Sequence, residues 1–491
     1  MKIVCVYDNH IEPNIFIKNI IGQKTFGEVI LKRKSIRSKF QTFIKTQTTV
    51  DEVLELDYEW QLSALVEKIK QFDEGTHIIH LFSNFVIVDE NKADIMIKKA
   101  PYITENYVCM SENIPVLLMF SNTTEYCAML KKYSSMLQDK ELYTRDSVEI
   151  KFEKIETDAF YNLGIHSNFM QYISGGFDAR FFNSVKGDEF TVVKTSTDKK
   201  KIKAEYTFYY LLPDYMKTWF VMPYNYQETE GNASYEMERL HITDLAIRWV
   251  HGAITIDEMD KLLNKAFHFI QIRSRKSVSE EEYKKVETSL YLDKVDERID
   301  KLKAHPQYML FKEFIEDGTD FSGLDEIVKK YKDLFIRINE ALPKEHYSVI
   351  GHGDLCFSNM LFNKEADLLK LIDPKGAVEE NQMWTNPYYD VAKLSHSICG
   401  RYDFFNNGLH HISLDGNLKF KLDIDFDNTE YKKKFKYYVE KHGFSYEAVR
   451  IYETSLFLSM LPLHMDNPQK VFGFILNAID IMEEIESCLK N

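Results

Sequence analysis

Two thirds of the way along the chain, three short apolar segments follow one another, and each lies beside an oxygen-bearing side chain. The stretch reads VIGHGDLCFSNMLFNKEADLLKLIDPKGA, from Val349 to Ala377. Asp354 follows the first apolar segment, Asn359 begins the second, and Asp373 follows the third. Short apolar runs separated by turn-forming residues predict strands. This stretch therefore requires β-structure that presents three polar side chains close together in sequence.

The three side chains have the chemistry that phosphoryl transfer requires. A carboxylate such as Asp354 can orient and deprotonate an acceptor hydroxyl, and Asn359 and Asp373 supply hard oxygen ligands for Mg²⁺. Alternatively, Asp and Asn are simply turn formers between strands, which is their commonest local role. Each residue alone favours the turn explanation. The set of three, with His352 and Gly353 ahead of it, favours a site.

A lysine and a glutamate upstream extend the pattern. Lys194 lies within the strand-like TVVKTS, and Glu205 lies within the helix-like KAEYTFYYLLP. A lysine in a buried strand is costly unless it is paired. We therefore predict an ion pair with Glu205 that holds the lysine against nucleotide phosphates. The alternative is a solvent-facing lysine like its neighbour Lys200.

Two further segments are candidates for nucleotide binding. The sequence SGGF begins with Ser174, Gly175 and Gly176, which would cover the phosphates or form a plain hairpin turn between strands. The connector EMERL contains Glu238, Arg239 and Leu240, whose backbone groups would read adenine. That second assignment follows only from the order of the segments along the chain.

At this point the sequence resembles a known family. HGDLCFSN followed by LLKLID is similar to the H-G-D-x-x-x-x-N … I-D signature of the aminoglycoside phosphotransferase and choline kinase family. The resemblance implies a protein-kinase-like fold over residues 155–491, with ATP and Mg²⁺ as cofactors. It makes Asp354 the catalytic base, Asn359 and Asp373 the metal ligands, and Lys194 with Glu205 the phosphate-binding pair.

The family pattern also bears on Asp390 and on the segment after Asp373. Asp390, in NPYYDVAKLSHS, falls where members carry a helix-starting Asp that supports the active-site loop, so we expect a structural role. The segment Asp373-Pro374-Lys375-Gly376 departs from the family pattern, which commonly has an aromatic residue after the metal-binding Asp. There, Lys375 could reach an anion on the substrate. DPKG together with HGDLCFSN is similar to a subgroup associated with bacterial capsule and surface-polysaccharide loci.

Candidate acceptor-binding residues lie in the helical part of the chain. Tyr402 and Asp403 occur in GRYDFF, and His464 and Asp466 occur in LPLHMDNP. Polar groups in aromatic or apolar surroundings suit a small hydroxylated or cationic acceptor. A histidine between two apolar residues is, however, more often part of the core.

Composition limits the class of protein. The 491 residues carry a net charge of -14, which argues against a nucleic-acid binder, since such proteins need a basic surface. No apolar run reaches the length of a membrane span, and the first residues lack the features of a signal peptide. The cysteines show no disulfide or zinc spacing; they are Cys5, Cys109, Cys127, Cys356, Cys399 and Cys488. We expect a cytoplasmic α+β protein without membrane insertion.

The pattern of apolar and polar residues changes along the chain. Residues 1–150 alternate strand-like runs such as KIVCVY, HIIHLF and IPVLLMF with amphipathic segments, and we predict a helix over VDEVLELDYEWQLSALVEKIKQF, residues 50–72. This block is loosely similar to sugar nucleotidyltransferases. Where those enzymes have a glycine-rich basic loop, this block has VYDNHIEPN. We therefore expect that it does not catalyse nucleotidyl transfer, and that it binds a ligand or partner or is a degenerate relative of those enzymes. We place a small lobe over residues 155–240 and a helical lobe over residues 241–491.

The function predicted from these features is an ATP- and Mg²⁺-dependent kinase that phosphorylates a hydroxyl of a sugar, polyol or amino alcohol. The alternative is a kinase-shaped module that binds a nucleotide or glycan precursor without transfer. A protein kinase is disfavoured, because Gly353 stands where those enzymes have an arginine that reads a phosphorylated activation loop. The sequence does not indicate the acceptor or the oligomeric state.

Overall fold

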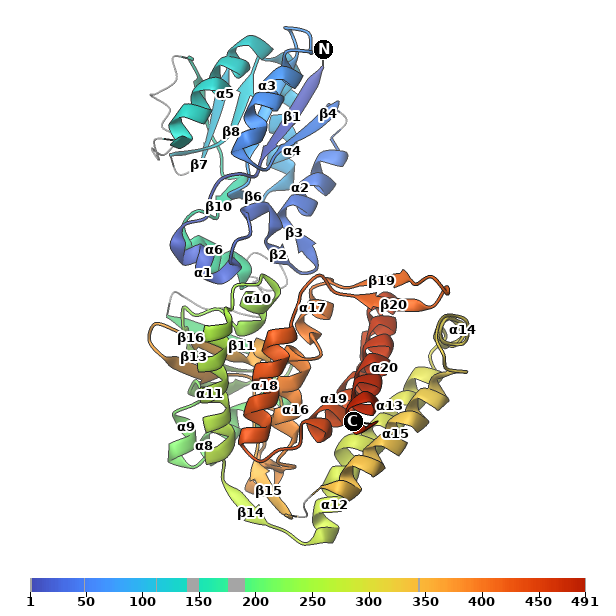
Figure 1. Ribbon diagram of the computed structural model, residues 1–491. Coiled ribbons are helices and arrows are strands. Elements are labelled where there is room, and N and C mark those ends of the chain that lie inside the picture. Colours follow the sequence, from blue (N-terminus) through green and yellow to red (C-terminus); the bar gives the residue numbers. More distant parts are fainter. Residues whose placement is uncertain are drawn as a thin grey trace. The chain divides into compact units, whose positions relative to one another are not determined.

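The computed structural model describes residues 2–47, 49–111, 113–138, 150–174, 190–342 and 345–490. The chain forms two compact units, residues 1–181 and residues 182–491 (Figure 1). Among the described residues, the first unit has one large hydrophobic core and the second has two. The predicted α+β class is confirmed.

The first unit is built on a six-stranded mixed sheet with the order β4-β1-β5-β8-β7-β9. Its strands are β1 (Ile3–Asp8), β4 (Glu52–Leu56), β5 (His77–Phe82), β7 (Tyr107–Ser111), β8 (Ile114–Phe120) and β9 (Glu153–Glu156). Its helices are α1 (Ile15–Ile21), α2 (Ile36–Lys45), α3 (Leu62–Ile69), α4 (Glu90–Lys99), α5 (Thr123–Gln138) and α6 (His166–Ile173). Short pairs join β2 (Ile30–Leu31) to β3 (Lys34–Ser35) and β6 (Phe85–Ile87) to β10 (Phe160–Asn162).

The strands predicted from KIVCVY, HIIHLF and IPVLLMF are confirmed as β1, β5 and β8. Every residue of β1 and β5 is buried, as their apolar runs require for strands covered on both faces. The single helix predicted over residues 50–72 is wrong in its first half. Leu54 and Leu56 are both buried on strand β4, which pairs in parallel with β1, and helix α3 begins only at Leu62.

The first unit extends beyond the boundary that the sequence suggests near residue 150. Strand β9 pairs with β7, strand β10 pairs with β6, and helix α6 packs against β10. The segment from Glu153 to Ile173 therefore belongs to the first unit and not to the small lobe predicted from residue 155. Tyr172 and Ile173 are helical, so no strand precedes Ser174, and Gly175 and Gly176 lie outside the described residues.

The second unit begins with a small antiparallel sheet. Its strands β11 (Thr191–Ser196), β12 (Pro223–Glu228) and β13 (Ala233–Glu238) have the order β11-β13-β12. Helix α8 (Lys199–Leu211) packs against all three strands and buries Ile202 against Tyr235. Helix α9 (Asp214–Lys217) follows α8. This sheet and its helix match the predicted strand at Lys194 and helix at Glu205.

The rest of the second unit is mostly helical. The helices are α10 (Leu245–Val250), α11 (Ile256–Ile272), α12 (Glu280–Thr288), α13 (Lys294–Lys303), α14 (Tyr308–Gly318), α15 (Leu324–Ala341), α16 (Tyr389–Ile398), α17 (Tyr402–Asn406), α18 (Thr429–Lys441), α19 (Tyr446–Met460) and α20 (Pro468–Lys490). Helices α19 and α20 lie side by side (Figure 1), and more than half of the residues in each are buried.

Three small β-sheets lie among these helices. Strands β14 (Arg275–Ser277), β15 (Tyr347–Ile350) and β18 (Trp384–Thr385) form one sheet, β16 (Met360–Asn363) pairs with β17 (Leu368–Leu371), and β19 (His411–Leu414) pairs with β20 (Phe420–Asp423). The three strands predicted beside Asp354, Asn359 and Asp373 are thus present as β15, β16 and β17.

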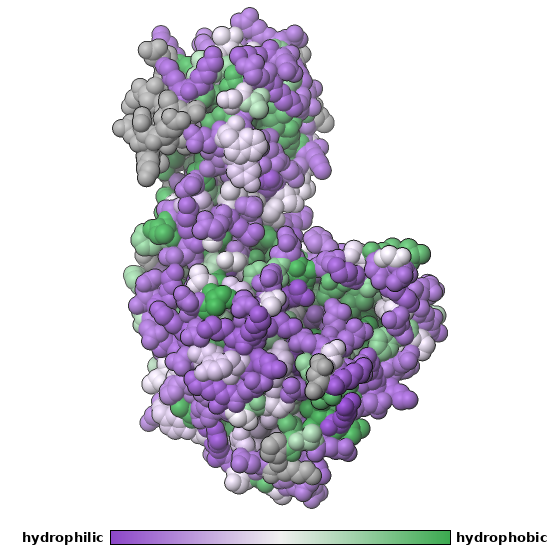
Figure 2. All heavy atoms as spheres, in the orientation of Figure 1, coloured by the Kyte–Doolittle hydropathy of each residue, from purple (hydrophilic) through white to green (hydrophobic). Residues whose placement is uncertain are grey.

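Polar side chains cover most of the face in Figure 2, and apolar residues on it occur in small groups. Such a surface is typical of a chain that buries its large apolar residues, as Trp249 and Tyr291 are buried here. None of the helices that the structure describes is both long and apolar enough to cross a bilayer.

Candidate functional site

The loop after β15 is fixed by one buried carboxylate. Asp390, in the first turn of α16, accepts hydrogen bonds from the backbone N–H groups of His352 (2.9 Å) and Gly353 (2.8 Å). The same carboxylate receives a hydrogen bond from Arg273 at 2.8 Å, and both side chains are almost fully buried. Asp390 therefore holds the backbone that precedes Asp354, in agreement with the structural role predicted for it.

His352 joins this loop to the strand that leads to Asp373. Its Nδ1 accepts a hydrogen bond from the backbone N–H of Asp354 (3.1 Å), and its Nε2 donates to the carbonyl of Ile372 (2.9 Å). A backbone N–H can only donate and a carbonyl can only accept, so the proton of the neutral ring is on Nε2. The buried imidazole thus connects the residue before Asp373 directly to Asp354.

The β16–β17 hairpin connects Asn359 to the same group. The carbonyl of Asn359 accepts a hydrogen bond from the N–H of Ile372 at 3.0 Å. The Asn359 side-chain nitrogen donates to the backbone carbonyl of Asp354 (2.8 Å) and to its carboxylate (3.1 Å). Because the nitrogen makes these bonds, the side-chain oxygen Oδ1 is the atom that can ligate a cation. The three residues predicted from the sequence are therefore neighbours.

The predicted ion pair between strand β11 and helix α8 is present. The ammonium of Lys194 contacts the Glu205 carboxylate at 2.7 Å and the Asp373 carboxylate at 2.7 Å. Tyr235 of β13 also donates to Glu205, at 3.0 Å. Burial alone would lower the pKa of Lys194, but Asp373 and Glu205 raise it above its usual value. Lys194 is thus a stable cation that lies directly against Asp373.

The segment between α9 and β12 is connected to β17 through backbone hydrogen bonds. Leu371 donates its N–H to Trp219 (2.7 Å), and its carbonyl accepts from Val221 (3.2 Å). Asp373 follows two residues later with φ of 54°, in the left-handed region that L-residues seldom adopt. This turn directs the chain from β17 past Lys194.

The sequence did not predict the closest cation to Asp354. Lys393, from α16, places its Nζ 2.9 Å from the Asp354 carboxylate. Burial would raise the pKa of Asp354, but Lys393 and the neighbouring hydrogen bonds lower it below its usual value. The pKa of Lys393 is raised, since Asp354 outweighs the effect of burial. Lys393 is three residues after Asp390, and this i,i+3 spacing on one helix face is the signal that could have revealed it.

Two of the predicted acceptor-binding residues, Tyr402 and His464, contact the same lysine. The Tyr402 ring stacks on His396 with 4.2 Å between centroids, and Lys470 lies over Tyr402 and 3.3 Å from Nδ1 of His464. Asp466 is exposed to solvent close to the start of α20. Tyr402 and His464 therefore belong to one polar group in the helical core. Their role in binding remains a prediction.

Asp403 is buried one position beyond Tyr402. Burial raises the pKa of its carboxyl group to about 7, since the hydrogen bond from Ser397 offsets only part of the cost of desolvation. A group with such a pKa changes charge near neutral pH.

The remaining predicted residues lie on connections. Glu238 ends β13, and Arg239 and Leu240 begin the segment that leads to α10, as their order in the sequence suggests. Arg239 donates its backbone N–H to the carbonyl of Phe190 at 2.7 Å. Lys375 donates its backbone N–H to the carbonyl of His352 at 2.9 Å, which places it next to the loop that carries Asp354. Ser174 lies at the end of α6 in the first unit.

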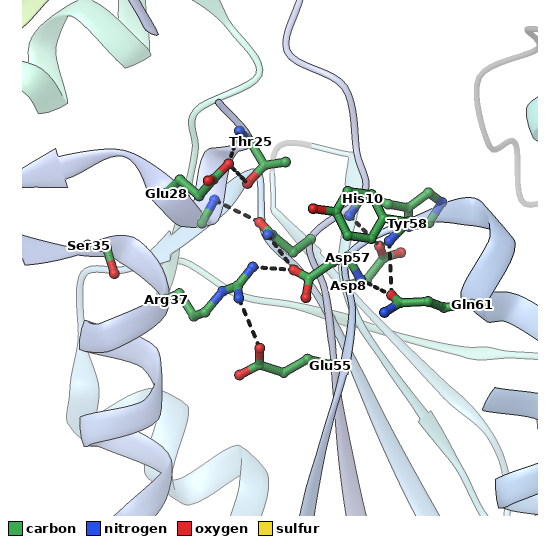
Figure 3. Close-up of polar contacts among 12 residues, drawn as sticks. Asp8, His10, Thr25, Glu28, Ser35, Arg37, Glu55, Asp57, Tyr58 and Gln61 are labelled. Carbon is green, nitrogen blue, oxygen red and sulfur yellow. Dashed lines mark hydrogen bonds and ion pairs between the residues drawn. The ribbon is translucent and has the colours of Figure 1, made fainter. Parts of the chain in front are cut away.

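A second polar cluster lies at the carboxyl ends of β1 and β4 in the first unit (Figure 3). Asp8 contacts His10, and its other oxygen accepts hydrogen bonds from Tyr133 (2.7 Å) and His80 (3.1 Å). Burial would raise the pKa of Asp8, but hydrogen bonds from the two histidines hold it well below its usual value. This cluster was not predicted, because its members come from three separate elements.

On the β4 side of the same edge, charged side chains connect α2 to the sheet (Figure 3). Arg37 contacts Glu55 at 3.1 Å and also contacts Asp57. Asn9 donates to Asp57 at 2.9 Å and accepts from the backbone N–H of Gly27 at 2.8 Å. These bonds connect the segments after β1 and β4.

No protein-family profile and no curated protein matches this chain. Solved structures do match. An apo form of a thermostable mutant of aminoglycoside phosphotransferase APH(4)-Ia is 12% identical, with 62% of this chain and 97% of that chain covered at a TM-score of 0.34. A ternary complex of a D198A form with ADP and hygromycin B is 12% identical, covers 62% and 96%, and has a TM-score of 0.35.

A further match is an aminoglycoside-3'-phosphotransferase of type VIII. It is 11% identical, with 61% of this chain and 88% of that chain covered, and the TM-score is 0.28. These similarities are weak, so the assignment of function depends on the geometry of this chain.

Proposed function

We propose that the second unit is an ATP- and Mg²⁺-dependent phosphotransferase that phosphorylates a hydroxyl group of a small molecule such as a sugar, polyol or amino alcohol. One observation carries the proposal. Lys194 of the small sheet contacts both Glu205 of α8 and Asp373, while Asp354 and Asn359 are hydrogen-bonded to each other and Asn359 is bonded to the backbone of Ile372. This is the set of groups that phosphoryl transfer requires.

The residues present fit a magnesium ion. The carboxylate of Asp373 and the Asn359 oxygen Oδ1 are hard donors of the kind that Mg²⁺ prefers, and the Asn359 nitrogen is already oriented toward Asp354. When bound there, the ion would neutralise charge on the nucleotide phosphates. Lys194 would then exchange its contact with Asp373 for the phosphate oxygens, and Glu205 would keep its ammonium oriented.

Asp354 is the group that would receive or steer the proton of the acceptor hydroxyl. Lys393 and Asn359 hold its two oxygens, so the carboxylate is ionised and its direction is fixed. Its side chain retains 42% exposure, which leaves room for an acceptor to approach. Lys393 is a positioning residue in this scheme. It acts on the acceptor only through Asp354.

The test is Mg²⁺-dependent ATP turnover with a panel of neutral, amino and anionic hydroxyl compounds. We expect at least one acceptor to be phosphorylated, and we expect Asp354→Asn to lower kcat by about 10²–10⁴. The affinity for nucleotide should change little, because Asp354 does not contact the phosphate-binding pair. Asp333→Asn, on an exposed position of α15, is the control and should keep full activity.

The competing function, nucleotide binding without transfer, predicts a different result. Such a module would bind ATP tightly and transfer phosphate to none of the acceptors. Full turnover in Asp354→Asn would show instead that the base is another residue.

A further inference from the structure

A cavity of about 400 Å³ lies in the second unit beside the loop that carries Asp354. Its walls include Phe208 of α8, Lys285 of α12, Gly353 of the loop, Lys375 and Trp384. Pockets that hold small ligands typically enclose roughly 300–1,000 Å³ and combine apolar walls with a few polar groups. The size and lining of this cavity are therefore those of a ligand site.

The cavity is separate from the groups that would perform phosphoryl transfer. The described residues that line it do not include Asp354, Asn359, Asp373 or Lys194. A ligand here would contact the backbone next to these residues without contacting their side chains. A ligand in this cavity would therefore be distinct from the reacting parts of nucleotide and acceptor.

The charges in the wall indicate what kind of ligand would bind. Lys285 and Lys375 both line the cavity, and neither forms an ion pair with any residue in the described part of the chain. Lys284, the neighbour of Lys285, is paired with Glu280 at 2.7 Å. Glu282 is the one acidic side chain among the described lining residues. Both lysines are also exposed to solvent, and two cations without a carboxylate partner in the lining of one cavity favour an anionic ligand.

The cavity wall is physically connected to the proposed active site. Lys375 donates its backbone N–H to His352, and Ala377 donates to Ala204, directly before Glu205. At Gly376, a Cβ atom would lie 2.6 Å from the carbonyl carbon of Ala204 and 2.7 Å from the Glu205 nitrogen, so this segment packs tightly on α8. An anion held by Lys375 would therefore stabilise the backbone on which both Asp354 and Glu205 depend.

We propose that this cavity is a regulatory site for a small anionic ligand, a phosphate or carboxylate compound, bound by Lys285 and Lys375. The apolar wall at Trp384 and Phe208 contacts the remainder of the ligand. Binding at this site does not depend on the proposed phosphotransferase activity, because it uses a different set of side chains.

The experiment is isothermal titration of the full chain with pyrophosphate and with citrate, and with sorbitol as a neutral probe. We expect one of the anions to bind at one site per chain and sorbitol not to bind. Lys285→Met and Lys375→Met should each weaken binding by at least about tenfold, since each removes a charge-assisted contact. Lys284→Met is the matched control on the same helix and should leave the affinity unchanged.

Lys194→Met separates this site from the nucleotide site. We expect anion binding to survive that substitution, whereas anions that bind in place of nucleotide phosphates would be lost with it. The proposal is overturned if neither anion binds at millimolar concentration, or if Lys285→Met binds as tightly as the unaltered chain. Equal binding of sorbitol would also contradict it, because the two lysines would then not select for charge.

Discussion

At the scale of single residues, the second unit places each charged group of the proposed site against a partner of opposite charge. Lys194 is held by Glu205 and Asp373, and Asp354 is held by Lys393. Pairing of this kind offsets the cost of removing charges from water. It also fixes the direction of each side chain before any ligand binds, which is the condition for efficient catalysis by oriented groups.

The contact between Lys393 and Asp354 predicts a change in pH dependence. Since Lys393 lowers the pKa of Asp354, Lys393→Met should raise that pKa, and the acid limb of the kcat/KM profile should move to higher pH. Lys393→Arg keeps the charge and should keep the limb close to its original position. The measurement is kcat/KM from pH 4 to pH 9. A uniform loss of activity without displacement of the limb would mean that Lys393 only maintains the structure.

Residue chemistry made part of the site predictable. Lys194 and Glu205 could be paired from the sequence, because a lysine in an apolar strand requires a carboxylate from the following helix. Lys393 could not be assigned in this way. Its contact with Asp354 depends on how α16 packs against the loop after β15, and the sequence does not encode that distance locally. The same holds for Asp8 and His80, which lie on different strands.

At the scale of elements, helix α16 supports the loop that carries the proposed base, Asp354. Asp390 in its first turn accepts two backbone hydrogen bonds from the loop, and Lys393 one turn later contacts Asp354. The helix therefore sets both the backbone and the side chain of the proposed base. Arg273, at the end of α11, completes the arrangement by neutralising Asp390.

This arrangement predicts a large effect on stability. Asp390→Asn would leave the buried Arg273 without its carboxylate, and breaking a buried pair in this way costs about 3–5 kcal/mol. We expect the thermal transition of the second unit to fall by at least about 6 °C. Glu430→Gln, which removes an exposed ion pair with Lys433, is the control and should lower it by less than about 2 °C. Equal effects of the two substitutions would show that Asp390 does not clamp the loop.

The element assignments also show where sequence patterns are insufficient. The short, mostly apolar runs IPVLLMF and HIIHLF were enough to identify strands. EVLEL, from Glu52 to Leu56, fits both helical spacing and strand alternation, and only its pairing with β1 makes it a strand. Residues 153–173 were assigned to the wrong unit, because pairing of β9 with β7 and β10 with β6 is a long-range property.

At the scale of the whole molecule, the two units have separate hydrophobic cores, and all residues of the proposed site belong to residues 182–491. The second unit should therefore carry the activity by itself. We expect a fragment of residues 182–491 to bind nucleotide and turn over ATP, and a fragment of residues 1–181 to do neither. Loss of nucleotide binding in a folded 182–491 fragment, judged by circular dichroism, would mean that the first unit contributes to the site.

The central claim is that Lys194, Asp373, Asn359 and Asp354 form one phosphoryl-transfer site. The most direct measurement is a crystal structure of the full chain with Mg²⁺ and the non-hydrolysable nucleotide AMP-PNP. It should show Lys194 in contact with phosphate oxygens and a metal ion at roughly 2.0–2.1 Å from Asn359 Oδ1 and the Asp373 carboxylate. A nucleotide bound elsewhere, with Lys194 still paired to Asp373, would contradict it.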